Sequence, residues 1–467
     1  MLGPIPYDHN QYEETMRDLR GLKEFVDHLD DMGELQRITV PVDPRFEIPA
    51  VLDQIKGPKA PAVLFEKVKG HAIPVVGNLL GTERRMALAL GVEEGDVITH
   101  LQGKLDKKIT PFLITEENER VAFSLSDENA IQEILPILTH YARDSGPYIT
   151  SAVTSAKYPD SDVVGRGLHR IEIRGNTTAG ISLVNPPLSN IYDYHKQAGT
   201  RMEVAIAVGV DPAILLGTVL KAPKGVDKFA NVGGLMGGAV ATVRAKTVDI
   251  EIPAFAEIVL EGYIDPEEGE KGGILGEVSG YYMSFPSPTV HITTISLRRD
   301  AVYHGLLPKG SEVEQILSFV WGLKIIPTMK SEFPSIRDLH FVPDTFGAHL
   351  VMSTSGTDRG ENRRAVNMAL SFSNVKKAVI VDGDVDISNP LEVEWAMATR
   401  FQADRDLMVL SDLKGQPIDP STGPEFISSK IGVDATKPDR GNFDRIRFPD
   451  EIENRLTSII GEFNQGD

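Results

Sequence analysis

The middle of the chain constrains the fold most, because residues 111–310 contain a long run of strand candidates with few helices. Helices are expected to interrupt this run only at about 130–143 and 187–198. Such a run favours a closed β-barrel or a sandwich over a doubly wound parallel sheet. The strand candidates are HRIEIR, GISLV, MEVAIAVGV, AILLGTVL, ATVRAKTVDIEIP, AEIVLEGYI, VHITTISLRR and AVYHGLL.

The two flanking regions alternate between helical and strand patterns. In residues 1–110, helices are predicted at about 16–32 and 46–56, and short apolar strands follow each of them. In residues 311–448, the patterns predict helices in SEVEQILSFVWGLK and PLEVEWAMATRFQ, and buried strands in VKKAVIVDGDVDI and RDLMVLSD. We therefore predict a mixed α/β (α+β) protein with three domains.

The last segment, residues 449–467, has the spacing of an amphipathic helix. Pro449 and two acidic residues occupy its first turn, where the helix dipole favours negative charge. Its apolar face is formed by Ile452, Leu456, Ile459, Ile460 and Phe463. Two roles are open for this helix: it covers the chain's own core, or it contacts another subunit of an oligomer.

Composition excludes several kinds of chemistry. The 467 residues carry a net charge of −19, which argues against nucleic acid as a general partner. No apolar run approaches the roughly 18 residues of a membrane span, and the acidic N-terminus is unlike a targeting peptide. The absence of cysteine removes disulfides, thiolate chemistry and iron–sulfur clusters. We expect a cytoplasmic protein whose electron-sink chemistry, if any, needs an organic cofactor.

Common catalytic motifs are missing. The sequence contains no GxxxxGK[ST], GxGxxG, HExxH or GxSxG. The glycines of GGLMGGAV, residues 233–240, lack the spacing of a phosphate loop, and we expect close helix packing there. The acidic strand end DGDVD, residues 382–386, has the oxygen ligands that suit Mg²⁺. We favour an ordinary polar strand end over a metal site.

The stretch from Asp162 to Arg174 is the most suggestive local feature. It predicts a Gly-rich turn that runs into a strand, HRIEIR, with the period of two of a half-buried strand. Gly165 and Gly167 allow close backbone approach. Arg170 has the paired N–H donors that bind an anionic group. Taken alone, the stretch is better explained by an ordinary hairpin with a surface arginine, because glycine is common near strand ends.

Phrases spread over nearly the whole chain resemble one family in the right order. The chain resembles the UbiD family of reversible decarboxylases. The phrases are LRGLKEFVDHLDDMGELQRI near the start, HRIEIRGNTTAGI at 169–181, AVGVDPAILL at 207–216, IPAFAEIVLEGYI at 252–264, LGEVSGYY at 275–282, VIVDGDVDISNPLEVEWAMATRFQADRD at 379–406 and GVDATKP at 432–438.

The resemblance implies both a fold and a chemistry. The implied fold has an N-terminal α/β region, a central flavin-reductase-like split β-barrel at 111–310, and a C-terminal α/β domain. The implied cofactor is prenylated FMN, with a divalent Mn²⁺ or Mg²⁺ and a K⁺ ion at its phosphate. The modified flavin is the electron sink for the carbanion left by departing CO₂. A carboxylic acid then delivers a proton, and an arginine binds the substrate carboxylate.

The resemblance assigns two catalytic residues. The arginine of the family's N-x-x-x-x-R phrase falls on Arg170, and the final acid of its E-G-P-F-G-[E/D]-x-x-G-Y phrase falls on Glu277. Glu277 is the expected proton donor and acceptor, and Arg170 is its partner. The residues expected to contact the cofactor are Arg166, Gly167, Leu168, His169, Thr218, Lys221 and Lys228.

Four positions depart from the family's pattern. The first acid of the E-G-P-F-G phrase falls on Gly272. The three metal ligands are changed as well: the Asn falls on Gly165, the His falls near Pro187, and the Glu of the G-V-x-E phrase falls on Lys228. The acid missing at Gly272 has possible substitutes in Glu267, Glu268 and Glu270, although acids in such a run are usually solvated.

Three interpretations of the altered metal positions are open. Lys221, Lys224, Lys228 and Arg166 can neutralise the cofactor phosphate in place of the divalent ion. Alternatively, these lysines are solvated and Asp227 shifts by one position to become a metal ligand. In the third interpretation, the usual flavin site is absent.

We therefore expect a non-oxidative decarboxylase, or a carboxylase in reverse, that acts on an aromatic or α,β-unsaturated acid and exchanges CO₂. A flavin prenyltransferase would supply its cofactor, and a homo-oligomer (dimer or hexamer) or a larger carboxylase complex is expected. The alternative is a subunit of a multi-subunit aryl carboxylase that lacks the usual site. Such a subunit would be a scaffold, or would act without the cofactor on a phosphorylated aromatic.

Overall fold

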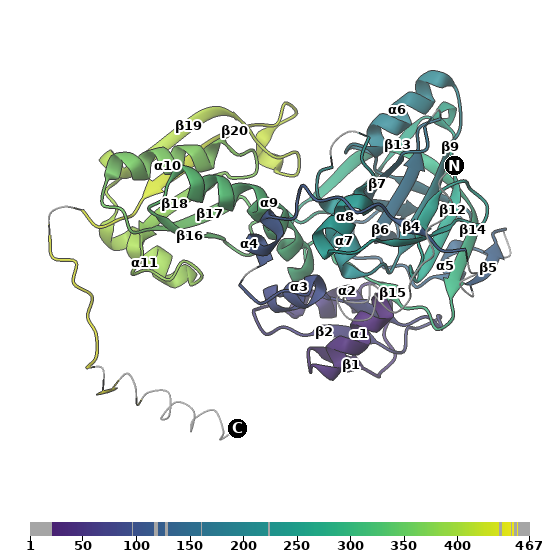
Figure 1. The fold of residues 1–467 in the computed structure, drawn as a ribbon, viewed down its shortest axis with the longest axis horizontal. Helices are drawn as coiled ribbons and strands as arrows, with labels where there is room; N and C mark the ends of the chain where they lie inside the picture. The colour runs from purple at the N-terminus through teal and green to yellow at the C-terminus, as the bar shows by residue number, and fades with distance from the viewer. Residues whose placement is uncertain are drawn as a thin grey trace, which may run out of the picture.

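The structure is a computed structural model, and it describes residues 21–95, 97–115, 120–126, 129–159, 161–222, 225–438, 441–449, 451–452 and 455. Three regions follow one another along the chain (Figure 1). No helix in these ranges is both long and apolar enough to cross a membrane. The amphipathic helix predicted for 449–467 lies almost entirely outside the described residues.

The N-terminal region is a small α/β unit. Its sheet has the order β1-β2-β3-β15, so a strand from the end of the central region completes it. The first helix has apolar residues that are buried in an apolar cluster shared with this sheet, among them Leu22, Phe25 and Leu29. The elements are α1 (Leu22–Asp31), β1 (Leu35–Ile38), α2 (Glu47–Gln54), β2 (Ala62–Phe65), β3 (Val75–Gly77), α3 (Glu83–Leu90), α4 (Val97–Gln102) and β15 (Tyr303–His304).

The central region is a β-barrel. Its large sheet has the order β12-β9-β6-β7-β8-β14-β13, and a further pairing of β12 with β14 closes it into a ring. Closure removes the exposed sheet edges at which other chains pair. The elements are β4 (Phe112–Leu113), β5 (Arg120–Ser124), α5 (Ile131–Ile134), β6 (Tyr148–Lys157), β7 (Val164–Ile173), β8 (Thr178–Ile181), α6 (Leu188–Ala198), β9 (Met202–Val208), α7 (Pro212–Val219), α8 (Lys228–Met236), β10 (Ala241–Arg244), β11 (Glu251–Pro253), β12 (Ile258–Ile264), β13 (Glu270–Gly276) and β14 (Tyr282–Arg298).

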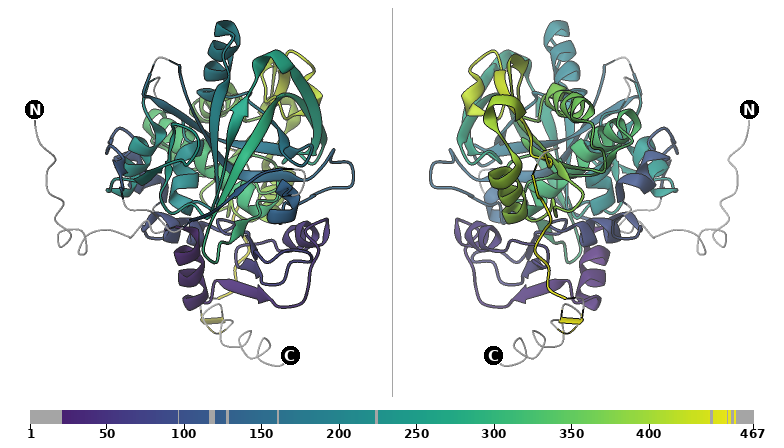
Figure 2. Two further views of the ribbon diagram at one scale, coloured as in Figure 1. Left: turned by 90° about the vertical axis from the view of Figure 1, so that its right-hand side faces the viewer. Right: turned by 90° about the vertical axis from the view of Figure 1, so that its left-hand side faces the viewer.

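The C-terminal region is a layered α/β domain that forms a separate lobe (Figures 1 and 2). The long helix α9 (Ser311–Glu332) leads from the barrel into it. Its sheet has the order β16-β17-β18-β20-β19, with a parallel centre and antiparallel edges. The elements are β16 (Ile336–Phe341), β17 (His349–Thr354), α10 (Arg359–Ser371), β18 (Lys377–Asp382), α11 (Pro390–Arg400), α12 (Ala403–Asp406), β19 (Leu407–Lys414) and β20 (Ile427–Asp434).

The mixed α/β class and most predicted elements are confirmed, but AILLGTVL is a helix and its prediction as a strand was wrong. It forms α7, which is buried on nearly every side. An apolar run that is buried all round shows no helical period, so pattern alone favoured a strand. The start signal lies just before it: Asp211 accepts a hydrogen bond from the Ala213 N–H at 2.7 Å, and Pro212 occupies the first turn.

Three further predictions need correction. The helix expected at 130–143 is only the single turn α5, because Leu135, which precedes Pro136, is extended. RDLMVLSD, predicted as a buried strand, forms β19, which pairs only with β20 at the sheet edge and is largely exposed. The glycines at 165 and 167 lie inside β7 and not in a turn before it.

Candidate active site

Strand β7 is the centre of the candidate site, because several of its residues carry polar or charged side chains. The predicted alternation is present: Ile171 and Ile173 are buried in the apolar core, and Arg170 and Glu172 project from the opposite face. Hydrogen-bonded pairing with β6 on one side and β8 on the other fixes the strand within the barrel. A rigid strand of this kind holds its side chains in defined positions.

The structure brings the two residues expected to be catalytic into direct contact. The guanidinium of Arg170 forms an ion pair with Glu277 Oε1. The Phe285 ring lies against the same guanidinium, 4.5 Å from it to the ring centroid. Burial lowers the pKa of Arg170 to about 10, and the neighbouring Tyr148 opposes this shift. Arg170 is therefore a desolvated cation at neutral pH, and such a cation binds a carboxylate more strongly than a solvated one does.

Glu277 lies at the turn that joins β13 to β14. Its backbone N–H donates to Tyr281 O at 2.9 Å, and its carbonyl accepts from the Gly280 N–H at 2.8 Å. Gly280 has φ 83°, which favours glycine and allows this tight closure. The preceding residue, Gly276, donates its N–H to Asp144 at 2.9 Å. The backbone around Glu277 is thus held on both sides.

A network of hydrogen bonds next to Arg170 connects β13 to the barrel. Ser145 Oγ accepts from the Ile274 N–H at 2.9 Å and also contacts the carboxylate of Glu172. The Tyr148 hydroxyl lies 3.0 Å from Ser145 Oγ, and burial raises its pKa to about 12. Sequence reasoning missed Glu172 and Tyr148. The alternation of the strand places Glu172 on the same face as Arg170. This pattern was the sequence signal that could have identified Glu172.

His169 is a neutral, buried imidazole. Burial lowers its pKa to about 4; a hydrogen bond to the Ser182 carbonyl opposes the shift, and the charges of Lys228 and Arg170 add to it. Its Nδ1 lies 2.7 Å from the Ser182 carbonyl oxygen. Because a carbonyl can only accept, Nδ1 carries the proton and Nε2 has the free lone pair.

Lys228 is also buried, at the first position of α8. Its Nζ donates to the Thr218 carbonyl at 2.5 Å, and burial lowers its pKa to about 8. The Thr218 hydroxyl bonds within its own helix, to Leu215 O at 2.8 Å. Lys221 is exposed, and Lys224 lies outside the described residues. Of the three predicted lysines, the structure therefore places one, Lys228, in a buried position near β7.

Arg166 and Asp227 form an ion pair with each other. Arg166 makes two hydrogen bonds to the Asp227 carboxylate, at 2.8 and 3.0 Å, and lies 3.8 Å over the Phe229 ring. Its remaining bonds reach Ser155 Oγ at 2.9 Å and the Glu251 carbonyl at 2.6 Å. Asp227 also caps α8 through the Phe229 N–H. These contacts leave Arg166 little capacity for a phosphate, and they give Asp227 a structural role.

The positions that the resemblance assigns to metal ligands carry no suitable donors. A Cβ at Gly165 would overlap Ile191 and lie 3.2 Å from Pro187 Cγ, so these two positions are neighbours in an apolar contact. The third position is the ammonium of Lys228. A divalent ion needs oxygen or imidazole lone pairs, and the described residues contain no cluster of three His, Asp or Glu side chains that could hold one. The usual divalent metal does not fit these residues.

The other acidic candidates have partners of their own. Glu268 contacts His291 at 2.7 Å, and Glu270 contacts Lys196 at 3.3 Å, both toward solvent. A Cβ at Gly272 would lie 2.5 Å from Ser284 Oγ. The acids of DGDVD, Asp382 and Asp384, pair with Arg400 and Lys437, which supports a polar strand end.

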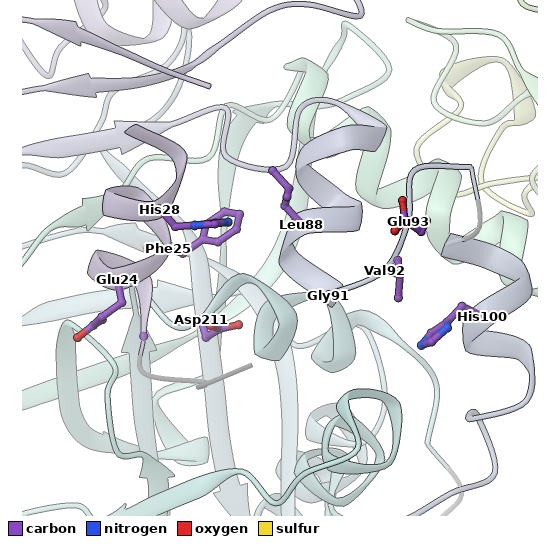
Figure 3. Close-up of a pocket in the computed structure, with 10 residues that line it drawn as sticks. Glu24, Phe25, His28, Leu88, Gly91, Val92, Glu93, His100 and Asp211 are labelled. Carbon is purple, nitrogen blue, oxygen red and sulfur yellow. The ribbon is translucent and has the colours of Figure 1, made fainter. Parts of the chain in front are cut away.

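A large cavity lined by described residues lies elsewhere. It has a volume of about 730 Å³ and lies between α1, the end of α3, α4 and the start of α7 (Figure 3). The labelled side chains include His28, His100 and Asp211, and neither Arg170 nor Glu277 belongs to its lining. We therefore place the candidate site at the Arg170–Glu277 pair and not at this cavity.

Comparison with known proteins agrees with the fold. The 3-octaprenyl-4-hydroxybenzoate carboxy-lyase N-terminal domain matches residues 26–105, the Rift-related domain of the same family matches 115–311, and its C-terminal domain matches 315–435. The chain belongs to the UbiD family. It is a UbiD-family carboxy-lyase, and Arg170 and Glu277 are in contact in its structure.

Relatives with similar sequences cover nearly the whole chain. An anhydromevalonate phosphate decarboxylase of Methanosarcina mazei is 32% identical over 444 residues, which are 92% of this chain and 99% of that protein. The UbiD-class enzyme HmfF of Pelotomaculum thermopropionicum, solved with FMN, is 34% identical with a TM-score of 0.86, over 94% of this chain and 99% of that one. An evolved dimeric form of HmfF, solved with prenylated FMN, has a TM-score of 0.83 at 34% identity, with the same coverage of both chains.

Proposed function

We propose that this UbiD-family enzyme is a non-oxidative, reversible decarboxylase of an aromatic or α,β-unsaturated carboxylic acid that uses prenylated FMN. The observation that carries the proposal is the pair of the partly buried Arg170 and the buried Glu277. A carboxylate-binding cation next to a protonatable acid is what exchange of CO₂ for a proton at one carbon requires. The two HmfF structures, which contain FMN and prenylated FMN, support the cofactor.

The residues present fit an anionic flavin. Lys228 is a buried ammonium that donates to a neutral carbonyl, and Ser182 next to His169 has a buried hydroxyl without a partner among the described residues. We infer that Lys228 and the segment Arg166–His169 lie against the cofactor. Bound prenylated FMN would supply the electron sink for the pair of electrons that CO₂ leaves behind.

The protein's own residues bind the substrate and move the proton. The substrate carboxylate competes with Glu277 for the guanidinium of Arg170. A second negative charge near Glu277 favours its protonated form, because two carboxylates cannot share one cation without repulsion. Departure of neutral CO₂ leaves the electron pair of the broken C–C bond, and its negative charge, on the substrate. Glu277 then gives its proton to the substrate carbon and pairs again with Arg170. In the carboxylation direction the same steps run in reverse.

The experiment is to purify the full chain after coproduction with a flavin prenyltransferase, the expected supplier of the cofactor. Mass spectrometry and the absorption spectrum should show bound prenylated FMN, and incubation with a panel of conjugated acids should release CO₂ from at least one. A protein that binds neither FMN nor prenylated FMN would contradict the proposal. That result would favour the scaffold subunit of a larger carboxylase.

A second candidate concerns the substrate class. The similar enzyme from Methanosarcina mazei is named for a phosphorylated acid. We therefore include phosphorylated unsaturated acids, anhydromevalonate phosphate among them, in the substrate panel beside aromatic acids. Release of CO₂ from a phosphorylated acid, with none from its dephosphorylated form, would assign this class.

A homo-oligomer is our proposal for the assembly. HmfF has been solved in an evolved dimeric form, and the segment 449–467 has the pattern of a docking helix. Light scattering on the purified chain, with and without this segment, should show a smaller assembly for the shortened protein. An unchanged assembly would assign the contact to another surface.

A further inference from the structure

Lys228 is a buried cation without an anionic partner. Its side chain is 8% exposed, and its Nζ donates to the Thr218 carbonyl. Among the residues that the structure describes, Lys228 forms no ion pair, because the acid beside it, Asp227, is neutralised by Arg166. A buried charge without a counter-ion is costly. Such a group indicates a ligand of opposite charge.

The arginines of β7 near Lys228 are each paired with an acid, Arg166 with Asp227 and Arg170 with Glu277, whereas Lys228 is not. Lys228 and Arg170 both act on the imidazole of His169 and lower its pKa, after the larger effect of burial. His169 itself is neutral, so it adds no charge at pH 7. The result is a local excess of positive charge near β7 in a protein whose net charge is −19. An anion with two negative charges, such as a phosphate monoester, matches this field.

A second buried lysine provides a comparison. Lys430 Nζ donates to Leu370 O at 2.9 Å and Phe372 O at 2.6 Å, at the carboxyl end of α10. Two carbonyls at a helix end, where the dipole is negative, account for a buried ammonium. Lys228 has one such carbonyl at the end of α7 and two donor directions left over. Those two N–H groups are available to phosphate oxygens.

We propose that Lys228 is the cation of a phosphate site and replaces the divalent ion at the phosphate of the flavin. This inference rests on the proposed function, because it names the group that the flavin phosphate meets. Three observations agree: Gly165 and Pro187 offer no ligand, Asp227 is held by Arg166, and Lys228 has the charge that a metal would otherwise provide. An ammonium group supplies this charge without any metal in the medium.

The test measures binding of FMN and of riboflavin, which lacks the phosphate, to the full chain in potassium buffer with EDTA. The wild type should bind FMN at least about 100-fold more tightly than riboflavin, with no loss on chelation. Lys228→Met should reduce this ratio at least about 10-fold. Lys430→Met removes a similarly buried ammonium far from β7, so it should lower thermal stability and leave the ratio unchanged.

The pH profile gives an independent readout on the wild type. Lys228 in the free protein loses its proton near pH 8, and a phosphate monoester loses its second proton near about pH 6. FMN affinity should therefore be highest between these values and should fall as the pH rises above about 8. Riboflavin affinity should not change across that range. If Lys228 had only a structural role, the affinities for FMN and for riboflavin would change together with pH.

Metal analysis decides the same point without a mutation. The FMN-loaded wild type should contain less than about 0.1 equivalent of Mn²⁺ or Mg²⁺. One equivalent of metal per flavin, with release of FMN by EDTA, would overturn the inference and leave the proposed function intact. An unchanged FMN-to-riboflavin ratio in Lys228→Met would do the same. Failure to bind FMN or prenylated FMN at all would overturn both.

Discussion

Arg170 is the residue on which the chemistry depends most directly. It meets a carboxylate and an aromatic ring at once, and its burial removes the water that would weaken both contacts. A guanidinium can hold a carboxylate through two parallel N–H donors, whereas an ammonium holds it as a point charge. The identity of this side chain, and not only its charge, should therefore matter.

Arg170→Lys should lower kcat/KM for decarboxylation by about 100-fold, because it removes the bidentate contact while keeping the charge. The matched control is Arg201→Lys. Arg201 also lies 4.5 Å over a tyrosine ring and pairs with an acid, Asp265, but on the surface. Steady-state kinetics should show no change for the control. Equal losses in the two variants would remove Arg170 from the mechanism.

Single residues also show where sequence reasoning stops. Arg170 and Glu277 were identified from the resemblance, although 107 positions separate them in the printed sequence, and the ion pair itself is visible only in the structure. Arg166 was expected to face a phosphate, but its partner Asp227 lies 61 residues away. Long-range pairs of this kind leave no local pattern for a single sequence to show.

Strand β13 is the element that positions Glu277, and its glycines make room for the network beneath it. A Cβ at Gly273 would lie within 2.5 Å of the Tyr148 hydroxyl and would overlap the Glu172 carboxylate. Both groups are held by Ser145 and cannot move freely. At Gly272 the nearest atom is the Ser284 hydroxyl, which can rotate away, and the next atom is 3.8 Å distant.

Gly273→Ala should therefore cost about 1–3 kcal/mol of stability and lower activity, because it displaces the network that holds β13. Gly272→Ala, the adjacent control on the same strand, should cost less than about 1 kcal/mol. Thermal unfolding and kcat measured on both variants test this difference. A Gly273→Ala variant as stable and active as Gly272→Ala would show that the network does not position Glu277.

The elements themselves were predicted where their patterns were regular. The amphipathic helix α1, for example, was predicted from its spacing, and its apolar residues Phe25, Val26 and Leu29 are buried. Failures came where the environment, and not the pattern, decides the structure. α7 is apolar on all faces, and β19 is an apolar strand at an edge. The local sequence predicts neither the burial of α7 nor the exposure of β19.

At the scale of the molecule, α9 connects the barrel to the C-terminal lobe, and a buried acid marks its start. The Glu314 carboxylate accepts the Phe346 N–H at 3.2 Å, and Phe346 belongs to the loop between β16 and β17. Burial raises the pKa of Glu314 to about 7, and the charge of Asp344 adds to this rise. The Phe346 N–H, Lys309 and Lys56 oppose the rise.

The sign of the pH effect follows from this raised pKa. The folded protein keeps a proton on Glu314 that the unfolded chain releases above about pH 4.5. This contribution to stability is present at low pH and is lost as the pH rises through about 7, and it amounts to at most about 3 kcal/mol. Glu314→Gln keeps the acceptor but cannot ionise. Its melting temperature relative to wild type should therefore rise by a few degrees between pH 5 and pH 8. A constant difference across that range would contradict this account.

The most direct test of the whole account is exchange of solvent deuterium into the decarboxylated product by Glu277→Gln loaded with prenylated FMN. Glutamine keeps the size of the side chain but carries no transferable proton, so exchange should fall by at least about 1,000-fold while folding and flavin binding are retained. Glu270→Gln, an exposed acid of the same strand paired with Lys196, should exchange at the wild-type rate. Wild-type exchange by Glu277→Gln would show that another group carries the proton and would end the assignment.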